Sequence, residues 1–167
     1  MTRCVGFAPV SRADARVLVL GTLPSVESLR RQQYYAKTQN AFWKIMADLT
    51  GVAPDASYDL RLESLKDAGV ALWDVCAAAR REGSLDADIR ETIPNDFAGF
   101  FRAHPSIKLI GFNGQAAAKL FRQHVAPSLP EAARKIPGVT LPSTSPAHAS
   151  INFERKRALW REALATL

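Results

Sequence analysis

Cysteine and long apolar runs are what this sequence most plainly lacks. Cys4 and Cys76 are the only cysteines among its 167 residues. Two cysteines are too few for a four-cysteine metal or iron–sulfur site, and they argue against a secreted scaffold held by disulfides. No apolar run reaches membrane-spanning length, and the first residues lack the apolar core of a signal peptide. We therefore expect a bacterial-type cytoplasmic protein with no membrane association.

Common nucleotide-binding and hydrolase motifs are absent as well. Residues 21–25 read GTLPS, and one glycine with a proline makes neither a dinucleotide fingerprint nor a Walker loop. A Gly-x-Ser-x-Gly elbow is also missing. This disfavours a serine hydrolase that would pair Ser145 or Ser25 with His148, although that alternative stays open at this point.

What the sequence does contain fits one folded domain over residues 1–167. Apolar residues make up 47% of the chain, enough for a full core and too many for intrinsic disorder. Lysine and arginine number 22 against 16 aspartates and glutamates, and the net charge of +6 suits a polyanion such as nucleic acid. The basic residues are dispersed, however, so a solvated helix face explains each small group of them, including residues 155–157.

Short apolar runs alternate with amphipathic segments along the chain. Four runs have the composition of buried parallel strands, and apolar residues at helical spacing predict helices between them. This alternation predicts an α/β protein with a three-layer αβα fold around a central, mainly parallel four-stranded sheet. The predicted strands are residues 17–20, 70–73, 107–112 and 139–141. The predicted helices are residues 42–49, a segment from Asn95 or Asp96 to His104, a short one from Ser84, and segments near 116–121 and 153–167.

Polar residues follow each predicted strand. Gly21 and Thr22 follow the first, Asp74 the second and Asn113 the third, while a proline-stiffened loop rich in hydroxyls, residues 142–149, follows the fourth. Parallel strands gather their carboxyl ends at one edge of a sheet, where ligands bind in α/β proteins. We predict a functional site at that edge.

Taken together, these segments resemble the uracil-DNA glycosylase superfamily. The closest resemblance is to its hypoxanthine-DNA glycosylase branch, with the mismatch-specific uracil glycosylases next. It runs from about Val17 to about His148 and depends on the combination and order of the motifs. The motifs are GTLPS at residues 21–25, YYAKTQNAFW at 34–43, LWDV at 72–75, GSLD at 83–86, NDF at 95–97 and FNG at 112–114.

The resemblance implies a monofunctional DNA glycosylase of base excision repair. Such an enzyme flips a deaminated base, uracil with hypoxanthine as a further candidate, out of the duplex and hydrolyses its N-glycosidic bond, leaving an abasic site. We expect a monomer that uses no metal or cofactor and acts on nucleoid-associated DNA in the cytoplasm. A non-catalytic protein that binds damaged DNA or abasic sites would share the fold and the charge, and remains an alternative.

The resemblance places the catalytic residue at Asn40, because the asparagine before the Phe-Trp segment carries the activity in the hypoxanthine branch. An amide both accepts and donates hydrogen bonds, so it can orient a water. Asn40 also stands directly before a predicted helix, so a role as N-cap is the competing explanation. Leu23 occupies the position where other branches carry a catalytic Asp or Asn, a loss typical of the hypoxanthine branch. With Gly21 and Thr22 it would line the base pocket.

Two further residues would hold the flipped base. Tyr35 matches the aromatic residue that stacks on it, and stacking favours any planar base. Asn113 matches the strand-end asparagine that reads the base edge. Its amide complements N3–H and O4 of uracil and equally N1–H and O6 of hypoxanthine. The structural alternatives are a core position for Tyr35 and a turn position for Asn113 beside Gly114.

The loop after the last strand matches the DNA-intercalating loop of the superfamily. Its hydroxyls and backbone amides would hold phosphates, and its small residues would wedge the minor groove. His148 stands where the hypoxanthine branch often has asparagine. It resembles the histidine that donates to the uracil oxygen in uracil-specific branches, with a phosphate contact as the alternative. The predicted DNA-binding residues are Ser143, Thr144, Ser145, Pro146, Ala147 and Lys37.

The segment before Asn40 departs from the family pattern. Lys37-Thr38-Gln39 replaces the usual His-Pro-x or Asn-Pro-x, and the lost proline removes rigidity next to the catalytic position. Lys37 is thereby left to contact a phosphate. We interpret Asp74 as a helix cap or a supporting residue rather than as an acid.

Overall fold

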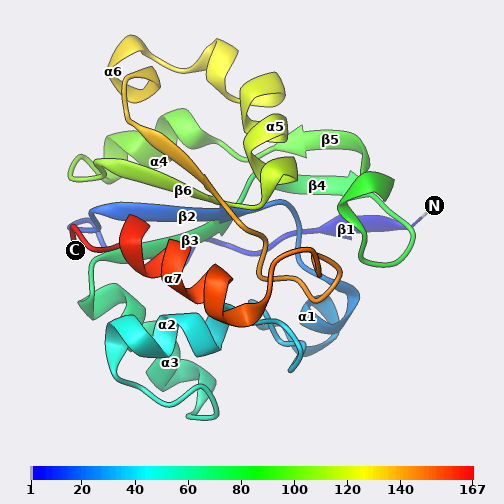
Figure 1. Ribbon diagram of the computed structural model, residues 1–167. Coiled ribbons are helices and arrows are strands. Elements are labelled where there is room, and N and C mark those ends of the chain that lie inside the picture. The colour runs from blue at the N-terminus through cyan, green and yellow to red at the C-terminus, as the bar shows by residue number, and fades with distance from the viewer. Residues whose placement is uncertain (1) are drawn as a thin grey trace.

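The computed structural model describes residues 2–167, and at its centre is a four-stranded sheet in which all strands are parallel (Figure 1). The strand order is β3-β2-β6-β7. The four predicted apolar runs form these strands, because such runs suit a parallel sheet that is covered on both faces. The strands are β2 (Val17–Gly21), β3 (Val70–Asp74), β6 (Leu109–Asn113) and β7 (Gly138–Leu141).

Helices cover both faces of this sheet, which confirms the predicted three layers (Figure 1). Side chains of a strand point alternately to its two faces, so Leu18 and Leu20 pack into one core while Val17 and Val19 pack into the other. The first core contains α4 (Phe97–Ala103), α5 (Gln115–His124) and α6 (Glu131–Arg134). The second contains α2 (Phe42–Thr50), α3 (Tyr58–Asp67) and α7 (Phe153–Ala163).

The sequence did not predict a second sheet, of three antiparallel strands in the order β1-β4-β5. The run that forms β4, CAAAR, has no β-branched residue and gave no strand signal. β4 follows β3 after only Val75, whose N–H donates to the Gly21 carbonyl at the end of β2. The β4–β5 connection therefore lies beside the carboxyl edge of the central sheet. The strands of the second sheet are β1 (Arg3–Val5), β4 (Cys76–Arg80) and β5 (Arg90–Pro94). The connection between β4 and β5 contains the 3-10 helix η1 (Asp86–Asp88).

Helix ends largely follow their sequence signals. Asp96 caps α4 by accepting a hydrogen bond from the Gly99 N–H, and the helix ends before His104 as predicted. The predicted helix from Ser84 is only the short η1, which starts two residues later. Within residues 2–167, no helix has the length and apolar character needed to cross a membrane. The remaining helices are α1 (Val26–Arg31) and η2 (Ala126–Ser128).

Candidate active site

A cleft of about 720 Å³ opens at the carboxyl ends of the parallel strands. The loops after β2, β3, β6 and β7 contribute to its walls, together with residues 34–40 and the loop that leads into η1. This is the sheet edge at which the sequence predicted a site. Every predicted site residue lines the cleft: Gly21, Thr22, Leu23, Tyr35, Lys37, Asn40, Asn113, Ser143, Thr144, Ser145, Pro146, Ala147 and His148.

Asn113, at the end of β6, is locked into the protein by its side-chain amide. Its Nδ2 donates to the Tyr35 hydroxyl at 3.1 Å and to Thr144 Oγ1 at 2.9 Å. Its Oδ1 accepts from the Thr144 N–H at 2.9 Å. Both amide hydrogens are therefore used inside the protein, and one lone pair of Oδ1 remains. Donation to a base edge requires Asn113 to release one of these partners, so this role stays a prediction.

Thr144 joins two walls of the cleft. It is 1% exposed, and its carbonyl accepts from the Ala41 N–H at 3.0 Å. This hydrogen bond ties the loop after β7 to the segment that carries Asn40. The burial of Thr144 suits a positioning role, whereas its neighbours Pro146 and Ala147 are exposed and better placed to meet DNA.

Tyr35 combines an unusual backbone with a ring that has one covered face. Its φ of 53° lies in the left-handed region, which costs a non-glycine residue on the order of 1–3 kcal/mol and is found most often at functional sites. Its ring stacks on Phe42 with 4.1 Å between centroids, so only the opposite face is left for a base. Burial and the charge of Asp74 raise the pKa of Tyr35 above its ordinary value, so the hydroxyl stays protonated.

Asn40 lies directly before Ala41, the N-cap residue of α2, and keeps part of its amide free. Its Oδ1 accepts from the Phe42 N–H at 2.9 Å, so its side chain satisfies a free N–H of the first helical turn, which is the contribution that the capping explanation requires. Its Nδ2 has no hydrogen-bond partner within residues 2–167, and the residue is half-buried in the cleft wall. The cap fixes the orientation of the amide, and the NH₂ group remains for a water or a substrate. Capping and the predicted catalytic role are therefore compatible.

The glycine after β2 is required by close packing. A Cβ at Gly21 would lie 2.6 Å from Asp74 Oδ1 and 3.0 Å from the Tyr35 hydroxyl oxygen. Gly21 has no positive φ. Next to it, the Thr22 hydroxyl donates to Asp86 Oδ1 at 2.6 Å, which holds η1 at the rim of the cleft.

Buried Arg81 fixes the loop after β2. It is 1% exposed, its Nε donates to the Gly83 carbonyl at 2.8 Å, and its Nη2 donates to the Pro24 carbonyl. Leu23 is 7% exposed and packs in a small apolar cluster with Cys76. The position that is acidic in other branches is thus an apolar wall here.

Asp74, at the end of β3, is the residue of this site that sequence reasoning undervalued. It lines the cleft and is 4% exposed, and its Oδ2 has no hydrogen-bond partner among the described residues. Burial, with the nearby charge of Asp86, raises the pKa of Asp74 to about 7 against the opposing effect of Arg81. The helix-cap interpretation was wrong, because strand β4 and not a helix follows Asp74. Its place directly after a predicted strand was the available signal.

Helix α7 supports the loop after β7. Lys156 is 6% exposed, and its Nζ donates to the His148 carbonyl at 2.6 Å and to the Ser145 carbonyl at 3.4 Å. Trp160 Nε1 donates to the Pro142 carbonyl at 2.9 Å. We interpreted residues 155–157 as a solvated helix face, and this interpretation is wrong for Lys156, which is buried. The available signal was helical spacing, because Lys156 lies four residues before Trp160 and eight before Leu164, which are both buried.

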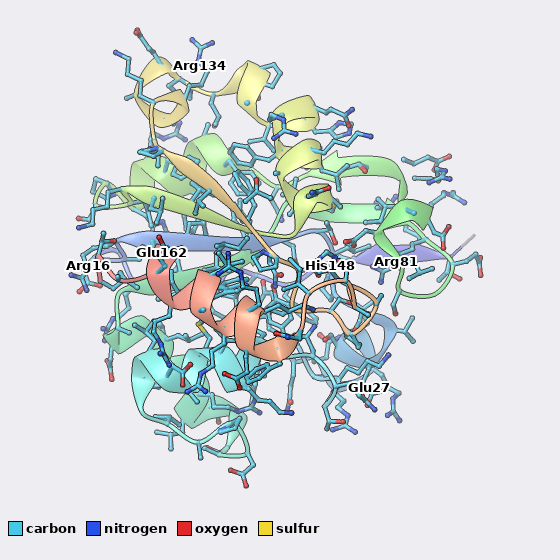
Figure 2. The ribbon with its side chains drawn as sticks, viewed as in Figure 1. Arg16, Glu27, Arg81, Arg134, His148 and Glu162 are labelled. Atoms are coloured by element: carbon cyan, nitrogen blue, oxygen red, sulfur yellow. The ribbon has the colours of Figure 1, made fainter. Side chains whose placement is uncertain are left out.

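His148 lies on this loop, ahead of α7 (Figure 2). Its Nε2 is buried and has no partner within residues 2–167. Nearly all buried polar atoms in proteins are hydrogen-bonded, so this ring nitrogen needs a partner that the described residues do not supply. This suits the predicted contact with a leaving base, which stays a prediction.

The serines of the cleft form turn and cap contacts. Ser145 Oγ accepts from the Ala147 N–H at 3.2 Å, and the Ser25 side chain caps α1. No hydrogen bond joins Ser145 to the His148 ring in the described part of the chain. A serine hydrolase needs such a nucleophile–base pair, and this geometry does not provide it. Likewise, no three His, Cys, Asp or Glu side chains in residues 2–167 are grouped as they would be to hold a metal ion.

The layers, the strand order and the tyrosine-walled cleft define an α/β protein whose ligand site lies at the carboxyl edge of its sheet. The family model of the uracil DNA glycosylase superfamily matches residues 8–167, and the chain belongs to this superfamily. This confirms the resemblance drawn from the motifs. The protein is therefore a DNA glycosylase.

Two curated relatives come from Methanosarcina species. The hypoxanthine DNA glycosylase of Methanosarcina acetivorans is 41% identical over 115 residues, which are 68% of this chain and 73% of the relative. That of Methanosarcina barkeri is 36% identical with the same coverage. A solution NMR structure of a Methanosarcina acetivorans protein, described as a candidate uracil DNA glycosylase, matches with a TM-score of 0.80 and 33% identity. It covers 97% of this chain and 99% of that protein.

Proposed function

We propose that this protein flips a deaminated base out of DNA and hydrolyses its N-glycosidic bond, leaving an abasic site. Uracil and hypoxanthine are the candidate substrates, the second supported by the names of the two curated relatives. The observation that carries the proposal is the cleft of about 720 Å³, walled by Tyr35 and floored by polar strand ends. Its size lies within the roughly 300–1,000 Å³ of small-ligand sites.

Recognition begins with Tyr35, whose ring face opposite Phe42 stacks on the flipped base. The hydrogen bond from Asn113 holds the Tyr35 hydroxyl, so the ring and the amide act as one preformed wall. A preformed wall lowers the entropy cost of ordering the flipped nucleotide.

Hydrolysis needs a positioned water and a way to stabilise the departing base. The sugar becomes oxocarbenium-like as the glycosidic bond breaks, and the base leaves with the electron pair. The amide of Asn40, fixed by its cap contact to Phe42, orients the attacking water. Leu23 supplies no carboxylate, so a neutral amide carries this step. His148 Nε2 stabilises the negative charge on the base by donating a hydrogen bond.

DNA lies across the rim of the cleft, where the exposed residues Pro146, Ala147 and Lys37 gather. The net charge of +6 favours the polyanion. We propose that the protein acts as a monomer, on nucleoid-associated DNA in the cytoplasm.

Base release from a panel of oligonucleotides tests this function. Each duplex carries one uracil, hypoxanthine, xanthine or mismatched thymine, with an undamaged duplex as the control. We expect free base and an alkali-labile abasic site from the uracil or the hypoxanthine duplex and none from the control. Tight binding without base release would instead assign the protein as a non-catalytic binder of damaged DNA.

A further inference from the structure

A carboxyl group without a role in the chemistry above lies at the floor of the cleft. Asp74 is 4% exposed, lines the cleft and leaves its Oδ2 without a hydrogen-bond partner in residues 2–167. Its Oδ1 lies beside Gly21, 2.6 Å from the point that a Cβ would occupy, and the Tyr35 hydroxyl lies 3.0 Å from the same point. Asp74 therefore shares its corner of the cleft with the tyrosine that stacks on the base.

The surroundings of Asp74 favour the neutral acid over the carboxylate. Burial and Asp86 raise the pKa of Asp74 to about 7, and only Arg81 opposes them. The Arg81 guanidinium donates to the carbonyls of Gly83 and Pro24, so its hydrogen bonds are committed elsewhere.

The other titratable groups that face Asp74 are uncharged. Burial raises the pKa of Tyr34, of Tyr35 and of Cys76, the last to about 12. The Asn95 amide contacts the backbone carbonyl of Asp74 at 2.8 Å and not its carboxyl. At neutral pH a large fraction of Asp74 is therefore the neutral acid.

We propose that Asp74, as a neutral carboxylic acid, hydrogen-bonds the edge of the flipped base and donates to the carbonyl oxygen that gains charge as the base leaves. A carboxylic acid offers one donor and one acceptor side by side. This pair complements the adjacent N–H and C=O that hypoxanthine and uracil have in common. A carboxylate would offer acceptors only and would repel both the carbonyl oxygen and the departing anion.

The contrast with Asn113 strengthens this assignment, which rests on the proposed function. Both amide hydrogens of Asn113 are taken by Tyr35 and Thr144, whereas the Asp74 carboxyl has an unused oxygen. In the reaction, the glycosidic electron pair leaves with the base and water forms the new bond to the sugar carbon. The proton released from that water ends on the base, so Asp74 is unchanged after the turnover.

Single-turnover excision measured between about pH 5.5 and pH 9 tests the proposal. The wild-type rate is expected to fall as pH rises through about 7, by up to about tenfold per pH unit, as Asp74 ionises. The Asp74→Asn variant keeps a donor and an acceptor without titrating, so its excision should persist with no such fall. The Asp74→Ala variant should lose about a hundredfold to a thousandfold at pH 6, as expected for a lost stabilising donor.

Matched variants separate this effect from general changes of charge. Asp86→Asn should move the wild-type midpoint to lower pH, because Asp86 is one cause of the raised pKa of Asp74. Asp55→Asn, at an exposed site before α3, should leave rate and pH profile unchanged. Normal excision by Asp74→Ala, or an alkaline fall that persists in Asp74→Asn, would overturn the proposal.

Two further readouts do not depend on turnover. The pKa of Asp74 is higher in the folded protein than in the unfolded chain, so the wild type should lose stability as pH rises from about 4 to about 7. The melting temperature of Asp74→Asn relative to wild type should accordingly increase over this range.

If the wild type excises no base, the proposed function fails. The role of Asp74 is then tested by the pH dependence of binding to oligonucleotides that carry the damaged base. A preference for hypoxanthine or uracil oligonucleotides that weakens above about pH 7 in the wild type only would retain Asp74 as the base-reading group, and a pH-independent preference would reject it.

Discussion

Asn113 and Asp74 end two strands that flank β2, yet their side chains have opposite surroundings. Asn113 makes three hydrogen bonds within the protein, to Tyr35 and Thr144. Asp74 has an oxygen with no partner in residues 2–167 and a raised pKa. A buried polar atom left unsatisfied costs about 1–3 kcal/mol. The hydrogen-bonded side chain of Asn113 holds the walls of the cleft together. The Asp74 oxygen without a partner gains a hydrogen bond only when a ligand binds.

Asn40 belongs to both groups, since one atom of its amide is engaged and the other is free. Asn40→Ala should reduce single-turnover excision by a few hundredfold, equivalent to about 3–4 kcal/mol of transition-state stabilisation. Loss of the cap to Phe42 should at the same time lower the free energy of unfolding by about 1 kcal/mol. Excision assays and thermal melting of the same sample measure both.

Two controls divide these effects. Asn40→Asp keeps an oxygen for the cap but loses the NH₂ group, so it should melt near the wild type and still excise poorly. Ser57→Ala removes the side-chain cap of α3, outside the cleft, and should cost stability alone. Near-normal excision by Asn40→Ala would transfer the catalytic role to His148 and backbone groups of the loop after β2.

The amino-acid sequence predicts the central sheet and the position of the site well, because those depend on local patterns. Apolar runs mark the strands, and Asp96 and His104 mark the limits of α4. Motif order identifies the family. The second sheet was missed because alanine-rich β4 is held by its pairing with β1 and β5 rather than by its own propensity.

Contacts between side chains that lie far apart in the sequence were the least predictable feature. The type of side chain does not distinguish buried Lys156 from exposed Arg155, and nothing local shows that Gly21 leaves room for Asp74. The engaged amide of Asn113 depends on Thr144, which lies 31 residues away in the sequence. Such contacts follow from the way the strand ends converge, and they decide which predicted site residue is free to act.

Replacing Asn113, whose side chain makes three hydrogen bonds within the protein, should reduce both the stability of the protein and the rate of excision. Asn113→Ala leaves the buried Thr144 N–H unpaired, so we expect a loss of about 1–3 kcal/mol in the free energy of unfolding. Excision should fall by about tenfold to a hundredfold because the Tyr35 hydroxyl loses its donor. Denaturant unfolding and single-turnover assays measure the two. Thr144→Val removes only the Oγ1 acceptor and should have the smaller effect, and unchanged excision by Asn113→Ala would contradict its place in the site.

His148 extends the comparison to the rim of the cleft, because its Nε2 is also buried and unpartnered. His148→Ala should slow excision by about tenfold while DNA binding changes less, since the ring acts on the leaving base. Single-turnover rates and equilibrium binding to a duplex with a non-hydrolysable analogue of the damaged nucleotide separate the two. If affinity falls and the rate at saturation stays normal, His148 is a phosphate contact.

Lys156 is expected to give the smallest effect, because it acts on the loop and not on the substrate. Lys156→Met keeps the apolar stem and removes the ammonium that donates to the His148 and Ser145 carbonyls. The loop then has to be ordered when DNA binds, so affinity should fall about threefold to tenfold, in line with an ordering cost of about 1 kcal/mol. The slope of affinity against salt concentration should stay the same, because a buried lysine releases no counterions. Arg155→Gln at the exposed neighbouring position is the matched control for a lost charge. A salt slope reduced by about one unit in Lys156→Met would show instead that Lys156 contacts a phosphate when the loop holds DNA.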